Sequence, residues 1–429
     1  MMNLRPNAKS LAFLSVMAIV AAACTSATTT TATPTTSATT APPATTGTTA
    51  APSTTAAAGE PIKIGALTDL TGFTPWAVQA RDGMLLAADE INAAGGVDGR
   101  EIEIVIEDSG NDADIGATGY DRLVEDGVVA IGGIISSTVG GTVSPKAEES
   151  QIPTFLIKSG TEAALTQSSR FMFRTCLPAA PMVAAPVLQY AQDQGFTNVG
   201  VIVADYPWGQ AFKSAVESVF AGSGVDYGEI QVAPVPPDTD FTPYVRALAD
   251  ADVQMVIGTG HPPGNAAIVT LSADLIGDVP VTGAWIPPDL AVGNLAETAI
   301  GRYTDFACAD YNSEGYAALA TRYLAASDNA FMSDDAVAGF GIVTMVADAI
   351  SNVGDDPVAI SEYLHGQTYD LEGYAHPVSW TEWGELATSA PVVSTISEGP
   401  APTGLNEAGD WWIEKVGQSE PLEPYTPAS

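Results

Sequence analysis

Few side chains in this sequence are suited to catalysis or to metal binding. The three histidines, His261, His365 and His376, are not at the spacing of zinc ligands. The acidic segment 108–114 lacks the glutamate that closes an EF-hand loop, so we interpret it as a turn that caps the next helix. Neither a Gly-x-Ser-x-Gly elbow nor a phosphate-loop pattern is found. We therefore expect a protein that is not an enzyme and that holds no metal or cofactor.

Cys24 follows three alanines at the end of a short apolar stretch, residues 11–20, which itself follows Arg5 and Lys9. A basic start and a short apolar run are typical of an export signal and are too short for a spanning helix. Small residues before a cysteine resemble a bacterial lipobox, so we predict a lipoprotein signal peptide at 1–23 and a lipidated Cys24. The alternative is an ordinary secretory signal with a cysteine by chance.

The other two cysteines are Cys176 and Cys308. An even number of cysteines in an exported chain favours one disulfide bond. Because connectivity does not follow from a count, two buried free thiols remain the alternative. A Cα separation well above about 7 Å would exclude the bond.

Residues 24–60 form a predicted disordered linker. Between 25 and 58 the chain contains only Thr, Ala, Pro, Ser and one Gly, so no large apolar side chain can offset the entropy of ordering. A spacer directly after a lipidated cysteine suits a domain that works away from the bilayer. We expect the protein in the cell envelope, anchored by its N-terminal lipid to the outer face of the cytoplasmic membrane.

The chain is strongly acidic, with a formal net charge of −36. Nucleic acid is excluded as a natural partner, because phosphate backbones need a basic face. The acidity otherwise serves solubility, in a saline habitat or elsewhere. The part after the linker is longer than one core normally organises, so two lobes are expected, and we identify no later segment as membrane-spanning.

Strand and helix patterns alternate from Pro61 onward. Residues 62–67 are typical of a buried strand, and 76–94 carry apolar residues at helical spacing before a Gly-Gly stop. The same rhythm returns after Pro178. Two such runs predict an α/β fold with two lobes built on parallel sheets. Ligands of these folds sit beyond the carboxyl ends of the strands, which places a site in a cleft between the lobes.

Two glycine-anchored segments are the most distinctive of the chain. Residues 64–72 read Ile-Gly-Ala-Leu-Thr-Asp-Leu-Thr-Gly, and residues 89–100 read Asp-Glu-Ile-Asn-Ala-Ala-Gly-Gly-Val-Asp-Gly-Arg. They resemble the opening strand, first helix and exit turn of the type I periplasmic binding proteins of the leucine/isoleucine/valine-binding family. Residues 107–108, 152–153 and 174–175 fall in the same register.

This resemblance implies the type I periplasmic binding protein fold, two Rossmann-like lobes joined by a three-strand hinge. Lobe I would comprise 61–175 and 309–372, lobe II 176–308 and 373–420, and 421–429 would be a tail. Cys176 and Cys308 would then lie in hinge crossings that run side by side. A disulfide would join the hinge without bridging the rims of the cleft.

The resemblance also implies that hydroxyls and backbone amides of lobe I hold a ligand carboxylate. The matching positions are Ser137 (Ser136 if the register slips by one), Ser159 and Thr161. Helix N-termini present unpaired N–H groups and a partial positive charge, which suits an anion. The alternative is that these residues only cap helices.

Aromatic residues are expected to close over the ligand: Trp76, Trp208 and Phe340 match family positions. Two departures concern lobe II. A tyrosine of the family is replaced by the segment around His261, and the acid that binds an ammonium group falls near Trp285, with Asp289 the nearest carboxylate. A buried ammonium without a counter-charge is costly. We therefore expect a small carboxylate or amide with an apolar or aromatic body, and keep a branched-chain amino acid as the alternative.

The function implied is that of a solute receptor for an ABC importer, a monomer that captures a small solute by hinge closure and docks on the permease subunits. A ligand sensor of the same fold that signals to a membrane partner is the chief alternative. An enzyme in the cleft is the third possibility, and the absence of a nucleophile and base pair argues against it.

Overall fold

Strand β1 (Ile62–Thr68) and helix α1 (Ala77–Ala93) form where the sequence predicts them. All residues of β1 except the half-buried Lys63 are buried, as expected of a strand that is covered on both faces of its sheet. The computed structural model describes residues 59–72, 77–235, 239–284, 296–329, 331–400 and 411–427, all within one compact unit, Thr55–Ser429. The expectations for the signal peptide, the linker, Cys24, Trp76, Trp285 and Asp289 lie outside the described residues.

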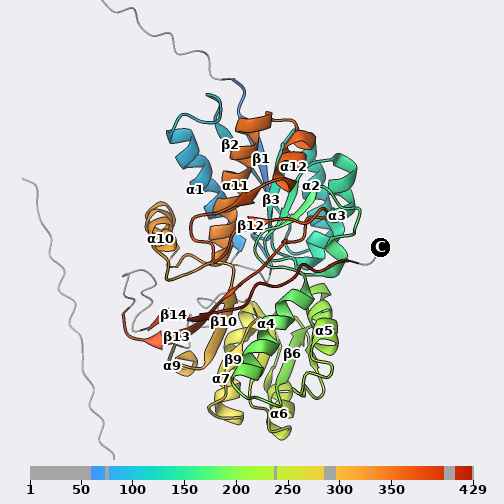
Figure 1. The fold of residues 1–429 in the computed structure, drawn as a ribbon, viewed down its shortest axis with the longest axis vertical. Helices are drawn as coiled ribbons and strands as arrows, with labels where there is room; N and C mark the ends of the chain where they lie inside the picture. The colour runs from blue at the N-terminus through green and yellow to red at the C-terminus, as the bar shows by residue number, and fades with distance from the viewer. Residues whose placement is uncertain are drawn as a thin grey trace, which may run out of the picture. The chain divides into compact units, whose positions relative to one another are not determined.

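Lobe I is built on a wholly parallel sheet of order β2-β1-β3-β4-β5 (Figure 1). Its other strands are β2 (Ile102–Asp108), β3 (Ala130–Ile134), β4 (Thr154–Leu156) and β5 (Met172–Arg174). Its helices include α2 (Ala113–Glu125), α3 (Ser137–Ser150), the 3₁₀ turn η1 (Glu162–Ala164), α10 (Glu314–Ala326), α11 (Asp334–Val353) and α12 (Pro357–His365). Parallel strands need helical crossovers, which is why helices cover this sheet.

Helices α1 and α11 pack side by side with their backbones in close contact (Figure 1). A methyl group on Gly83 would overlap the carbonyl of Ala336, and one on Gly339 would overlap the carbonyl of Ala80. Glycine is needed at both positions because only it lets the helices approach so closely. Helix α11 is long and apolar enough to cross a membrane, contrary to our expectation, but most of it is buried, as in a core helix.

Lobe II contains a seven-stranded sheet of order β14-β13-β10-β9-β8-β6-β7. Strands β6 to β10 are parallel, whereas β13 and β14 add an antiparallel edge. The strands are β6 (Gly200–Ala204), β7 (Gln231–Ala233), β8 (Val256–Thr259), β9 (Val281–Thr282), β10 (Tyr303–Ala307), β13 (Val392–Glu398) and β14 (Trp411–Gln418). The helices are α4 (Ala180–Asp193), α5 (Pro207–Val219), α6 (Thr242–Asp250), α7 (Pro262–Leu275) and α9 (Ala296–Ala299), and a small ribbon pairs β11 (Thr368–Tyr369) with β12 (Val378–Ser379). Two mainly parallel α/β sheets are thus confirmed.

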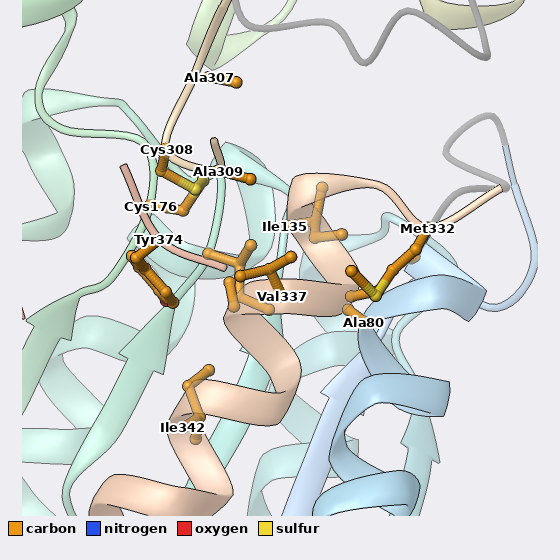
Figure 2. Packing of buried hydrophobic residues seen from close by; sticks show 14 of the residues in the cluster. Ala80, Ile135, Cys176, Ala307, Cys308, Ala309, Met332, Val337, Ile342 and Tyr374 are labelled. Carbon is orange, nitrogen blue, oxygen red and sulfur yellow. A yellow bond between two sulfur atoms is a disulfide. The ribbon is translucent and has the colours of Figure 1, made fainter. Parts of the chain in front are cut away.

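Cys176 and Cys308 form a disulfide, with their Cα atoms 5.2 Å apart, so the predicted pairing is confirmed. Figure 2 shows the bond beside Tyr374 and Ala309, close to the first turns of α11. Cys176 follows β5 of lobe I and Cys308 follows β10 of lobe II. The disulfide therefore ties together two of the segments through which the chain passes from one lobe to the other.

Trp380 lies within the range 373–420 that was expected in lobe II. It packs against β5 of lobe I, with its ring centroid 5.1 Å from that of Phe173. Its Nε1 donates a hydrogen bond to the carbonyl oxygen of Arg174 at 2.6 Å. Trp380 therefore contacts lobe I, whereas β13 and β14 belong to the sheet of lobe II.

Residues of the expected tail, 421–429, also form hydrogen bonds with the rest of the chain. Trp383 Nε1 donates to the carbonyl oxygen of Tyr425 at 3.1 Å, and Gln167 Nε2 donates to that of Pro427 at 2.8 Å. These side-chain contacts hold the described end of the chain against lobe I.

Candidate functional site

Ser136 and Ser137 lie at the start of helix α3 and have different roles. Ser136 is the N-cap, and its Oγ accepts hydrogen bonds from the N–H groups of Thr138 and Val139 at 3.1 and 3.4 Å. Ser137 Oγ is buried and has no hydrogen-bond partner among the described residues. Since a buried hydroxyl normally finds a partner, Ser137 is the residue of this pair suited to a ligand.

Ser159 and Thr161 lie on the loop that follows β4, and this loop packs closely against α3. A methyl group on Gly140 of α3 would overlap Ser159 Oγ, so the glycine is required for the approach. Ser159 Oγ is also buried and unpartnered within the described ranges, whereas Thr161 Oγ1 caps η1 by accepting from the N–H of Ala163 at 3.4 Å. Two unused hydroxyls, those of Ser137 and Ser159, therefore come from adjacent elements.

Trp208 is a lobe II residue that contacts this loop. It lies in the first turn of α5 and is 5 % exposed, and its six-membered ring lies against Gly160. Its Nε1 donates to Thr259 Oγ1 at the end of β8, at 3.1 Å, which holds the indole in place. Trp208 and the Ser159–Thr161 loop therefore make a direct contact between the lobes.

His261 is fully buried at the N-terminus of α7, with its ring 5.1 Å from that of Phe241 in an edge-to-face arrangement. Burial lowers the pKa of its imidazole to about 4. His261 is therefore neutral at physiological pH and supplies no positive charge for a carboxylate. The preceding Gly260, with φ +79°, contacts both Tyr206 and Trp208.

Phe340 is placed elsewhere. Its ring lies 5.9 Å from the guanidinium of Arg322, which forms ion pairs with Glu90 and Glu372, each at 2.7 Å. These residues belong to lobe I around α1, α10 and α11, so the structure does not bring Phe340 to the serines or to Trp208.

Asp69 and Tyr206 were not predicted as site residues. Asp69 lies directly after β1, is almost fully buried and accepts a hydrogen bond from Ser109 Oγ. Burial, and then the negative charge of Asp69, raise the pKa of Tyr206 in lobe II above its usual range, so the charge of this lobe I residue acts on lobe II. An acid directly after the carboxyl end of a buried strand is the sequence signal that points to Asp69.

Lys158, the residue before Ser159, connects the loop to the hinge. Its Nζ lies 2.8 Å from Asp334 Oδ1 and 3.6 Å from Asp335 Oδ1. Burial lowers the pKa of this amine, but the two carboxylates outweigh burial, and the pKa lies above its ordinary value. Asp334 Oδ2 also lies 3.4 Å from Cys176 Sγ.

Metal binding is not indicated at the groups that most resemble a metal site. Cys176, Cys308 and Asp334 bring potential ligand atoms together, but both sulfurs are committed to the disulfide. In the acidic segment 108–114, Asp112 caps α2 through the N–H groups of Asp114 and Ile115, in agreement with the turn that we predicted.

Comparison with known proteins agrees with this architecture. The Leu/Ile/Val-binding protein BraC3 of Rhizobium johnstonii is 24 % identical over 359 residues, which cover 76 % of this chain and 94 % of that protein. The crystal structure of the leucine-, isoleucine-, valine-, threonine- and alanine-binding protein from Brucella ovis, in its closed conformation, superposes with a TM-score of 0.74 at 18 % identity, over 86 % of this chain and 99 % of that one. A solute-binding protein of an ABC transporter from R. palustris in complex with benzoate gives 0.72 at 15 % identity, over 86 % and 98 %.

A family model described as a periplasmic binding protein matches residues 61–400. The match includes both lobes, the hinge disulfide and the loops that carry Ser137, Ser159 and Trp208. Proteins of this family bind solutes outside the cytoplasm and are not enzymes, as the sequence led us to expect. The chain belongs to the periplasmic binding protein family.

Proposed function

We propose that this protein is the solute receptor of an ABC importer and that it captures a small carboxylate with an apolar or aromatic body. The observation that carries the proposal is the pair of buried hydroxyls on adjacent lobe I elements, Ser137 Oγ and Ser159 Oγ, which have no hydrogen-bond partner in the described part of the chain. Trp208 of lobe II lies against the same loop. Polar donors on one lobe and an indole from the other fit a ligand with a polar head and an apolar body.

A carboxylate suits the polar end of the site. Both serines offer hydroxyl donors, and Ser137 lies in the first turn of α3, where the helix dipole favours negative charge. His261 is neutral, so it does not draw the anion away from the two serines. The relatives fit either ligand class, because one is named for branched-chain amino acids and another holds benzoate.

Closure of the two lobes about the hinge is the mechanism that we propose. The ligand would bind lobe I first, and Trp208 would then close over it. Only contacts that the ligand makes in the closed form can drive this motion. The Cys176–Cys308 disulfide joins two hinge segments and involves neither Trp208 nor the loop that Trp208 contacts.

Anchoring through Cys24 completes the proposal. A receptor tethered by lipid and a linker of about 34 residues, 25–58, would stay near its permease while its lobes remain free to move.

Calorimetry with leucine, 4-methyl-2-oxopentanoate and benzoate tests the ligand class, and native mass spectrometry of the purified protein tests for a retained solute. Binding of the acids with leucine silent would support the proposal. Tight leucine binding would favour a branched-chain amino acid, and loss of that binding in Asp289→Ala or Asp69→Asn would show which carboxylate meets the ammonium. Uptake of the bound solute that requires both the receptor and a permease would distinguish an importer from a sensor.

A further inference from the structure

Arg174 is the largest fully buried side chain of the described residues, and it lies behind the Ser159–Thr161 loop. Its guanidinium donates to the carbonyl oxygens of Ser159 and Thr161, the second at 2.7 Å. The carbonyl between them, that of Gly160, accepts from the N–H of Ala180 at 3.0 Å. Three successive carbonyl oxygens of the loop are therefore bound by the protein itself.

The orientation of these carbonyls determines where the loop's N–H groups point. In a trans peptide the N–H of one residue points opposite to the C=O of the residue before it. With the Ser159 carbonyl held by Arg174, the N–H of Gly160 must point away from Arg174, and the N–H of Thr161 likewise points away from Ala180. Neither N–H has an acceptor among the residues that the structure describes, although both residues are buried. Buried N–H groups without partners are rare in native proteins, which indicates a ligand atom as their partner.

The charge of Arg174 is balanced by Glu385, whose Oε2 lies 3.0 Å from Arg174 Nε. Both side chains are at most 1 % exposed. A buried ion pair is weak as a source of stability, because desolvation of two charges offsets their attraction. The ion pair alone therefore does not explain why an arginine is buried here, and we look instead to the two loop carbonyls that its N–H groups bind.

We propose that Arg174 is a positioning residue for anion recognition: by binding the Ser159 carbonyl it turns the Gly160 N–H group toward the ligand's carboxylate. Its second bond, to the Thr161 carbonyl, fixes the far end of the loop, while Ala180 orients the Thr161 N–H group through the Gly160 carbonyl. Glu385 lies one step behind and balances the charge of the guanidinium. This inference rests on the proposed function, since it takes the Ser159–Thr161 loop as the carboxylate-binding loop.

A purely structural role is the competing explanation. Arg174 also belongs to β5, and its own carbonyl accepts from Trp380. A structural role predicts that any loss of affinity follows the loss of stability and is the same for charged and neutral ligands. A positioning role predicts a selective loss for the carboxylate.

Arg174→Lys keeps the positive charge but cannot bind two carbonyls in the same fork. Arg302→Lys is the matched control, because Arg302 of lobe II likewise donates to the backbone carbonyls of Val279, Thr298 and Gly277, at 3.2, 2.8 and 3.2 Å. The probes are benzoate and its neutral isostere benzamide, together with leucine and leucinamide. Each variant is measured by calorimetry, by thermal unfolding, and by hydrogen–deuterium exchange of the peptide that contains Ser159–Thr161.

We expect Arg174→Lys to weaken binding of the acid by about tenfold or more, the scale of one or two charge-assisted hydrogen bonds. Binding of the amide should change by less than about threefold, and exchange in the loop should become faster. Arg302→Lys should alter neither the ratio of acid to amide affinity nor exchange in the loop, even if its melting temperature falls.

Glu385→Gln provides a second test that does not depend on how well Arg174→Lys folds. Because burial raises the pKa of Glu385 to about 7, binding is compared at pH 8, where the substitution removes a negative charge behind the loop and leaves Arg174 in place. The protein should become less stable, while its preference for acid over amide stays the same or increases, because the uncompensated guanidinium attracts the anion.

Equal losses of acid and amide binding in Arg174→Lys, with unchanged exchange in the loop, would overturn the inference. So would a fall in acid preference in Glu385→Gln that parallels its loss of stability. If no probe binds the wild-type protein, the proposed ligand class fails, and the exchange of the Gly160 and Thr161 amides alone then decides whether Arg174 positions the loop.

Discussion

The six-membered ring of Trp208 lies so close to Gly160 that a methyl group on residue 160 would overlap it. One residue belongs to helix α5 of lobe II and the other to the loop after β4 of lobe I. The absence of a side chain at 160 is therefore what permits the two lobes to meet at the proposed ligand site.

Gly160→Ala should weaken binding of the ligand identified by calorimetry by about tenfold or more, because overpacking at this scale costs about 1–3 kcal/mol. Its melting temperature should also fall, since the added methyl would crowd Leu177. Gly141→Ala is the control: a Cβ at that position of α3 meets nothing within 4 Å, so we expect unchanged binding and a gain of up to about 1 kcal/mol in helix stability. Wild-type affinity in Gly160→Ala would contradict closure of Trp208 onto this loop.

Removal of the disulfide should destabilise the fold without abolishing the site. The bond closes a loop with a sequence separation of 132, for which the chain-entropy description gives about 4–5 kcal/mol, often less in practice. We expect Cys176→Ala/Cys308→Ala to unfold at lower urea concentration than the oxidised protein and to retain ligand binding at a stoichiometry of one. A double variant as stable as the wild type would show that the bond does not constrain the unfolded chain.

His261 should make stability depend on pH below neutrality. Its folded pKa of about 4 lies below its ordinary value of 6.5, so the unfolded state binds more protons between these values. The contribution of His261 to the free energy of unfolding should therefore be fully present above pH 6.5. It should fall by up to about 3 kcal/mol as the pH decreases toward 4.

Two other buried groups titrate in an overlapping range, and the measurement must separate them. Burial lowers the pKa of His376, which acts in the same direction, and raises that of Glu385 to about 7, which acts in the opposite direction. Urea unfolding of the wild type and of His261→Gln between pH 4 and 8 isolates the contribution of His261. Parallel pH profiles for the two proteins would show that His261 does not stay neutral in the fold.

The lipid anchor is tested by Cys24→Ser, which removes the only thiol that the lipobox would acylate. The variant should be released into the medium, while the wild type stays with the membrane fraction, because the anchor is then the main membrane contact. A variant that remains membrane-bound, or a wild type that is already soluble, would contradict lipidation.

Much of the architecture follows from local pattern. The apolar run of β1 and the helical spacing of α1 predicted those elements almost to the residue, because burial on both faces and a Gly-Gly stop are encoded within a few positions. The helical signal of α3 is weak in the sequence, since the helix contains Gly140, Gly141 and Pro145. The structure begins it at Ser137, where the Ser136 cap and packing of the helix on the sheet outweigh propensity.

By itself the sequence determined the alternation of strands and helices and the division into two lobes, because both depend on residues close together in the chain and on chain length. The resemblance to the periplasmic binding proteins pointed to the hydroxyl-bearing loops at the ends of β3 and β4. The tertiary structure decided that Ser137 rather than Ser136 has an unused hydroxyl, that Phe340 lies with Arg322, and that Arg174 holds the Ser159–Thr161 loop. These features depend on contacts between segments distant in sequence, such as the approach of Gly140 to Ser159 and of Glu385 to Arg174. No periodicity or local spacing records such contacts, since they arise only when the core has brought the segments together.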